Sequence, residues 1–123
     1  MPRVRTAVTM TVAPDDLEEL VGIFKTFIRG VLEHDRGTTR YEYFIDDGDP
    51  VTIHVSEEYE DSETHLDHYK HLDQQAVGRL LQLAQLGTPH YYGDPSPAER
   101  ELLANFGDVH FHRPLVSIDQ PDA

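Results

Sequence analysis

The stretch YEYFIDDGDPVTIHVSEEYEDSETHLDHY, residues 41–69, decides the fold of this chain. Apolar and aromatic residues alternate with polar ones on both sides of Asp47-Gly48, and a period of two is typical of half-buried strands joined by a tight turn. Asp61 follows the second strand directly and favours a helix N-cap, with Glu63 near the positive end of the helix dipole. The stretch therefore predicts a β-hairpin that runs straight into a helix.

Helical periodicity continues on the N-terminal side of the hairpin. Residues 15–35 carry apolar side chains three and four positions apart, which form one continuous stripe along a helix. Asp15 followed by Glu18 has the spacing of a capping box, and Gly37 can adopt the left-handed conformation that stops a helix. We therefore expect one long helix before the hairpin.

Further helices are expected after the hairpin. Residues 61–86 have helical spacing, but Asp73 falls within the apolar stripe, so it should divide a short helix from a second one ending at Gly87. Ser96-Pro97-Ala98-Glu99 is a capping box with proline at the first helical position, which predicts a helix that stops at Gly107.

Alternation over residues 109–118 predicts a last strand, so the expected order is β-α-β-β-α-α-α-β. This order predicts an α+β fold of the ferredoxin-like split βαβ type, with a four-stranded antiparallel sheet and an extended second crossover. The length suits a single domain, which we place at residues 1–119, and residues 120–123 are expected to form a loose tail.

Composition argues against several classes of protein. Ten basic and twenty-three acidic residues give a formal net charge of −13, which would repel nucleic acid and anionic lipid. Without cysteine there can be no disulfide, thiol nucleophile, thiolate zinc site or iron–sulfur cluster. The N-terminal residues lack an apolar run long enough for a signal peptide or a membrane span. We expect a cytoplasmic protein that binds neither nucleic acid nor membranes.

Glu57, Tyr59, Asp61 and His68 form the pattern E-x-Y-x-D-x₆-H, and with the preceding strand this resembles the antibiotic biosynthesis monooxygenase-like family of dimeric α/β barrels. That family includes cofactor-independent oxygenases of polycyclic aromatic quinols, quinol oxygenases, haem-degrading enzymes and members of no known activity. The likeness covers nearly the whole chain, because the family's first strand, first helix and last strand correspond to residues 4–12, 15–35 and 109–118.

The resemblance implies a homodimer in which two sheets pack face to face to form the barrel. The sequence gives a physical reason for this arrangement. Helices on one side of a four-stranded sheet leave its other side uncovered, and Val8, Met10 and Tyr43 or their alternates cannot all remain in water there.

The resemblance also implies a small-molecule monooxygenase that works without metal, haem or flavin on a quinol or polycyclic aromatic substrate. His68 matches the family's helix position, and Glu57 and Tyr59 share a strand face, so these three are the candidate catalytic residues. A carboxylate beside a phenol could deprotonate a bound hydroquinone before it reacts with dioxygen. Alternatively all three are structural, and the chain is a non-enzymatic, dimeric ligand-binding or accessory protein.

Eight histidines suggest a third hypothesis, a metal-dependent enzyme. His110 and His112 point to one side of a strand and could bind a metal ion with His54, although they could equally form a polar patch or a dimer contact.

Three other histidines, His65, His68 and His71, lie three residues apart on one helix. Each step rotates the side chain by roughly 300°, so the outer two diverge and a solvated or capping face is the simpler expectation.

Haem degradation is not expected. The chain has no tryptophan, His68 stands where that branch of the family carries its helix tryptophan, and Gly78 stands where its proximal histidine would fall. Arg40 and Arg113 could pair either with acidic neighbours or with a substrate carboxylate, and the sequence leaves both roles open.

Overall fold

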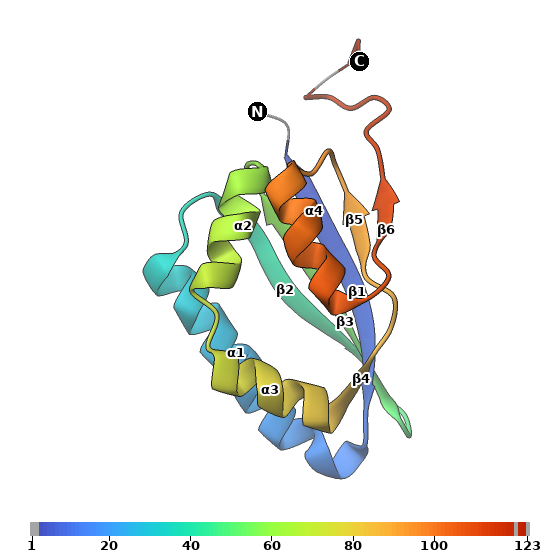
Figure 1. The fold of residues 1–123 in the computed structure, drawn as a ribbon. Coiled ribbons are helices and arrows are strands. Elements are labelled where there is room, and N and C mark those ends of the chain that lie inside the picture. The colour runs from blue at the N-terminus through green and yellow to red at the C-terminus, as the bar shows by residue number, and fades with distance from the viewer. Residues whose placement is uncertain (1–2, 120, 123) are drawn as a thin grey trace.

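A computed structural model of the protein describes residues 3–119 and 121–122 (Figure 1). Ten helices and strands follow one another in the described chain: β1 (Val4–Val12), α1 (Leu17–His34), β2 (Thr38–Asp46), β3 (Val51–Tyr59), α2 (Ser62–Lys70), α3 (Gln74–Leu83), β4 (Ala84–Leu86), β5 (His90–Tyr92), α4 (Pro97–Leu103) and β6 (His110–His112). Two 3₁₀ turns, η1 (Pro14–Asp16) and η2 (Ala104–Phe106), precede α1 and follow α4. No helix among the described residues combines the length and the apolar character needed to cross a membrane.

The strands form one open sheet in the order β2-β3-β1-β5-β6. β4 and β5 share the second edge of β1, where β4 pairs with residues 10–12 and β5 with residues 5–7. The predicted ferredoxin-like α+β class is confirmed. The prediction of four antiparallel strands was wrong in detail, because six strands pair among the described residues and β5 runs parallel to β6.

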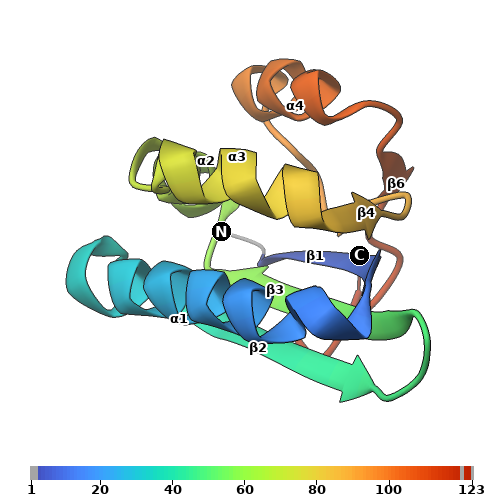
Figure 2. The ribbon, with the colours of Figure 1, turned by 90° about the horizontal axis from the view of Figure 1, so that it is seen from below.

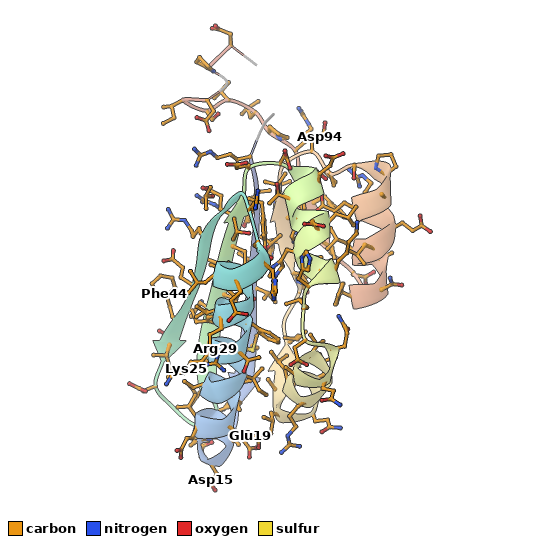
Figure 3. The ribbon with its side chains drawn as sticks, turned by 90° about the vertical axis from the view of Figure 1, so that its left-hand side faces the viewer. Asp15, Glu19, Lys25, Arg29, Phe44 and Asp94 are labelled. Carbon is orange, nitrogen blue, oxygen red and sulfur yellow. The ribbon has the colours of Figure 1, made fainter. Side chains whose placement is uncertain are left out.

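The helices lie on one side of the sheet, and Figure 2 shows α2, α3 and α4 above the strands β1, β3 and β2. Met10 is buried, and Val8 and Tyr43 pack against the same apolar core beneath α1. These residues therefore do not lie on the uncovered face. Their alternates do, and they are mostly polar, with Phe44 as an apolar exception on the outer side of β2 (Figure 3).

Three of the predicted helix starts are confirmed by side-chain caps. Asp61 accepts a hydrogen bond from the backbone N–H of Thr64 at 2.8 Å, and Asp73 accepts one from Ala76 at 3.1 Å. Ser96 accepts one from the N–H of Glu99 at 3.2 Å. These caps form because each oxygen reaches a nearby N–H that the helix itself leaves unpaired.

The start of α1 differs from its prediction. Residues 14–16 form the turn η1, and neither cap position carries a side-chain hydrogen bond, so the Asp15 and Glu18 capping box does not form. The helix ends at His34, and Gly37, with a left-handed φ of 87°, turns the chain into β2 instead of capping the helix directly.

The C-terminal third contains the larger corrections. α3 ends at Leu83 and not at Gly87, because residues 84–86 leave the helix and pair with β1. The last strand covers only His110–His112; Val109 is half-buried outside it, and residues 113–118 are exposed and irregular. Of the predicted loose tail 120–123, residues 121–122 form an exposed turn and the other two lie outside the described residues.

Candidate active site

A cavity of about 160 Å³ lies between the helices and the sheet. Its wall is mostly apolar and aromatic because the core faces of β1, β2, α2 and α3 meet there. The aromatic and aliphatic wall includes Phe27, Tyr41, Tyr43, Tyr69, Leu72, Val77 and Leu80. Glu57 and His68 bring ionisable side chains into this wall. An apolar cavity with few polar groups is the usual form of a small-molecule site.

His68 is held in this wall by two carboxylates. Its Nδ1 lies 2.6 Å from Oδ2 of Asp35, and its Nε2 lies 3.8 Å from Oε1 of Glu57. Asp35 also accepts a hydrogen bond from the hydroxyl of Thr38 at 3.2 Å. The His68 and Asp35 side chains are only 4% and 3% exposed. The Nδ1–H group of His68 therefore donates its hydrogen bond to Asp35, and Nε2 faces Glu57.

Tyr59 is fully buried behind Glu57, and its hydroxyl donates to the Glu57 carboxylate. Burial first, and then the charge of Glu57, raise the pKa of Tyr59 far above its ordinary value. The same two causes, in the same order, raise the pKa of Tyr41 in the cavity wall. Both phenols therefore stay protonated at neutral pH, so Tyr59 is a hydrogen-bond donor to Glu57 and not a base.

The three candidate residues named from the sequence lie together. The Tyr59 and His68 rings are 5.5 Å apart between centroids, and Glu57 contacts both side chains. Glu57 and His68 line the cavity, whereas Tyr59 lies behind it. Neither arginine belongs to this wall: Arg40 binds Glu42 at 2.7 Å, and Arg113 is exposed.

Asp35 and Tyr41 are the site residues that sequence reasoning missed. Asp35 follows a helix end and shows no periodicity, and its partner His68 is 33 positions away. The sequence pattern predicts only that Tyr41 lies in a strand. Alternation places Tyr41 on one face of β2, and the pairing of β2 with β3 sets it directly opposite Glu57. That register was the one signal that could have identified it.

A second polar cluster lies beside the site and is centred on a buried glutamate. Glu99 is fully buried and accepts hydrogen bonds from Tyr91 at 2.7 Å, from Ser62 and from Nδ1 of His65. His65 in turn stacks on Tyr59 with ring centroids 4.4 Å apart. The capping-box glutamate therefore ties α2, α4 and β5 together instead of facing solvent.

The expectation of a solvated or capping face on α2 was wrong for His65, whereas His68, which was set apart as a candidate site residue, lies in the cavity wall. His65 and His68 are buried, and only His71 is exposed. Each has a different carboxylate partner, Glu99, Asp35 and Asp67 respectively, so the three imidazoles do not converge.

The hypothesis that His54, His110 and His112 bind one metal ion needs a different third histidine. His54 does not join His110 and His112, because its Nε2 lies 2.6 Å from Oδ2 of Asp46 on the hairpin. The third imidazole is His90 of β5, and the three rings form a group on the strands β5 and β6. Sequence reasoning missed His90 because its short strand carries no alternation signal.

The sequence model of the family described as antibiotic biosynthesis monooxygenase matches residues 3–79. A search of curated proteins finds no match. MupZ from Pseudomonas fluorescens superimposes with a TM-score of 0.78 and 16% identity, over 100% of this chain and 98% of that chain. Rv0793 from Mycobacterium tuberculosis gives 0.62 and 13%, over 78% and 98%. A candidate antibiotic biosynthesis monooxygenase from Chloroflexus aurantiacus gives 0.58 and 21%, over 72% and 89%. At these identities the structural likeness shows the fold alone.

Proposed function

The chain belongs to the antibiotic biosynthesis monooxygenase family, and from this premise we propose that it is a cofactor-independent monooxygenase of a small quinol. The observation that carries the proposal is the pairing of Glu57 with His68 in the wall of an otherwise apolar, aromatic cavity. Asp35 behind the imidazole orients it through the contact with Nδ1. The site therefore offers Glu57 as a base, His68 as a proton carrier held by Asp35, and an apolar surface for an aromatic ring.

The size of the cavity favours a substrate with one aromatic ring. Its volume of about 160 Å³ is close to the ~150 Å³ of an engineered protein cavity that binds benzene. A single-ring hydroquinone fits inside such a space, whereas a polycyclic aromatic would leave its other rings outside. Among the substrates considered from the sequence, we therefore favour the quinol over the polycyclic compound.

The proposed reaction balances without an external reductant. Glu57 and His68 take up the proton of one phenolic hydroxyl, and the electron-rich quinolate ring then reacts with dioxygen to form a ring hydroperoxide. Loss of water from the hydroperoxide, with His68 returning the proton, leaves a hydroxyquinone. One oxygen atom enters the product, the other leaves as water, and the quinol supplies all the electrons.

Two phenols complete the proposed site. Tyr59 donates to Glu57 and holds the carboxylate in the cavity wall. Tyr41 accepts a hydrogen bond from Tyr43 at 3.2 Å, so its own hydroxyl hydrogen can point to a substrate oxygen. The raised pKa of Tyr41 keeps that hydrogen in place at neutral pH.

Oxygen consumption with single-ring hydroquinones and with naphthoquinols tests this proposal. We expect turnover of the smaller class, and a fall of ~10²-fold or more in His68→Ala. Because this change leaves Asp35 buried without its partner, the melting temperature will also fall. Added imidazole should also restore part of the turnover, which it would not do if His68 were only structural. The exposed His71→Ala is the matched control and should behave as wild type.

Tight quinol binding without oxygen consumption would contradict the oxygenase proposal. That result would instead support the dimeric ligand-binding or accessory role.

A further inference from the structure

Three histidines meet on the parallel strands β5 and β6. His90 lies opposite His110 in the register, and His112 lies two residues farther along β6, so all three side chains share one face of the sheet. Tyr91 and Phe111 point to the other face, where they pack in the core near α4. One nitrogen from each histidine lies within 4.8 Å of the other two. The group is therefore built by strand pairing and not by one flexible loop.

The imidazoles are already close enough to share a proton. Nδ1 of His90 lies 2.9 Å from Nε2 of His112, and this hydrogen bond requires that one of the two nitrogens keeps its lone pair. The rings of His110 and His112 also stack, with centroids 4.2 Å apart. A neutral imidazole nitrogen with a free lone pair is the form that binds metal ions.

We propose that His90, His110 and His112 bind one divalent transition-metal ion of the zinc class. Around a tetrahedral ion with Zn–N distances of ~2.0–2.1 Å, ligand nitrogens lie roughly 3.3 Å apart. Nitrogens within 4.8 Å of one another reach this arrangement by small side-chain rotations, in which the ion replaces the shared proton. A ligand set of imidazoles alone suits zinc or copper, and not magnesium or calcium.

This site adjoins the cavity of the proposed oxygenase site but contains none of its candidate catalytic residues. His90 lines the cavity, whereas His110 and His112 do not, and all three ligands lie beyond residues 3–79, which the family model matches. β6 is a short edge strand, and the chain that follows it is exposed. An ion that joins β5 to β6 would therefore hold the end of the sheet in place and leave one coordination position open to solvent.

Calorimetry with zinc chloride tests the proposal on protein that carries no affinity tag and has been treated with a chelator. We expect one ion per chain, a zinc-dependent rise in melting temperature, and no rise with magnesium. Each of His90→Gln, His110→Gln and His112→Gln should weaken zinc binding by ~10-fold or more. The matched control is His54→Gln, which removes another histidine from the same face and should bind zinc as wild type does.

The proposal fails if zinc does not bind saturably, or if the His110→Gln and His112→Gln double variant binds zinc as tightly as wild type. Circular dichroism of the metal-free variants establishes that each is folded before the comparison. Quinol turnover is not the readout, so failure of the oxygenase proposal would leave this result unaffected.

Discussion

The carboxylate of Asp35 lies 2.6 Å from Nδ1 of His68, although the two residues are 33 positions apart. Asp35 is the extended C-cap residue that directly follows α1, and His68 lies near the end of α2. The two side chains are almost fully buried against each other. This contact determines which imidazole nitrogen faces Glu57, and so which one can exchange a proton with a ligand.

The first prediction concerns this contact. Asp35→Asn should lower quinol turnover by ~10²-fold or more with little change in KM, because an amide nitrogen can donate to Nδ1 and so favours the wrong imidazole tautomer. Steady-state oxygen consumption measures the effect. Asp67→Asn, which alters an exposed carboxylate 3.9 Å from His71, is the control and should be neutral. An unchanged kcat in Asp35→Asn would remove this residue from the mechanism.

The second prediction concerns alkaline pH. Burial is the main cause that raises the pKa of five tyrosines, Tyr41, Tyr43, Tyr59, Tyr69 and Tyr91. Below their unfolded pKa of about 10 both states keep these protons, so no stability is lost. Above it the unfolded chain releases protons that the folded chain retains, and the free energy of unfolding falls as pH rises.

Urea unfolding midpoints at increasing pH, together with tyrosinate absorbance, measure this effect. The absorbance of these five tyrosines should rise only as the protein unfolds. Ionisation of all five near pH ~10 in the folded state would contradict their burial.

The third prediction concerns the buried carboxylate of α4. Glu99→Ala should lower the free energy of unfolding by about 3–5 kcal/mol, because His65, Ser62 and Tyr91 lose the acceptor they share. Urea denaturation measures the change. Glu101→Ala removes an exposed glutamate from the same helix and should stay within about 0.5 kcal/mol of wild type. Similar values for both variants would mean that the buried network adds little stability.

The fourth prediction is the homodimer, which we expect to form through the uncovered face of the sheet. Light scattering at micromolar concentration should give twice the chain mass of 14.0 kDa. Phe44 is 55% exposed on that face, so Phe44→Glu should weaken the dimer. Leu32→Glu is the matched control, because Leu32 is 80% exposed on α1. A monomeric wild-type protein at this concentration would exclude the expected dimer.

Much of the local structure could be predicted because its signals lie close together in the chain. The alternation around Asp47-Gly48 and the caps at Asp61, Asp73 and Ser96 each depend on contacts within a few residues. The spacing of Glu57, Tyr59 and His68 was readable for the same reason, since the hairpin leads directly into α2. Their closeness in space is observed, whereas their catalytic role stays a prediction.

The second edge of β1 was decided by tertiary structure. Its backbone groups need partners, and after the predicted helices the sequence indicated no strand before residues 109–118. Residues 84–86 and 90–92 pair there instead. Three-residue strands show no usable periodicity, so their positions follow from which segment reaches the free edge.

The chain by itself thus determined the hairpin, the helix caps and a motif with family resemblance, because short-range hydrogen bonds and periodicity specify each of them. Only the tertiary structure brought Asp35 to His68, enclosed Glu99 and placed His90 beside His112. These contacts join side chains 8 to 37 positions apart. Such pairs carry no local pattern, and they form only when strand pairing or the packing of helices on the sheet brings distant segments together.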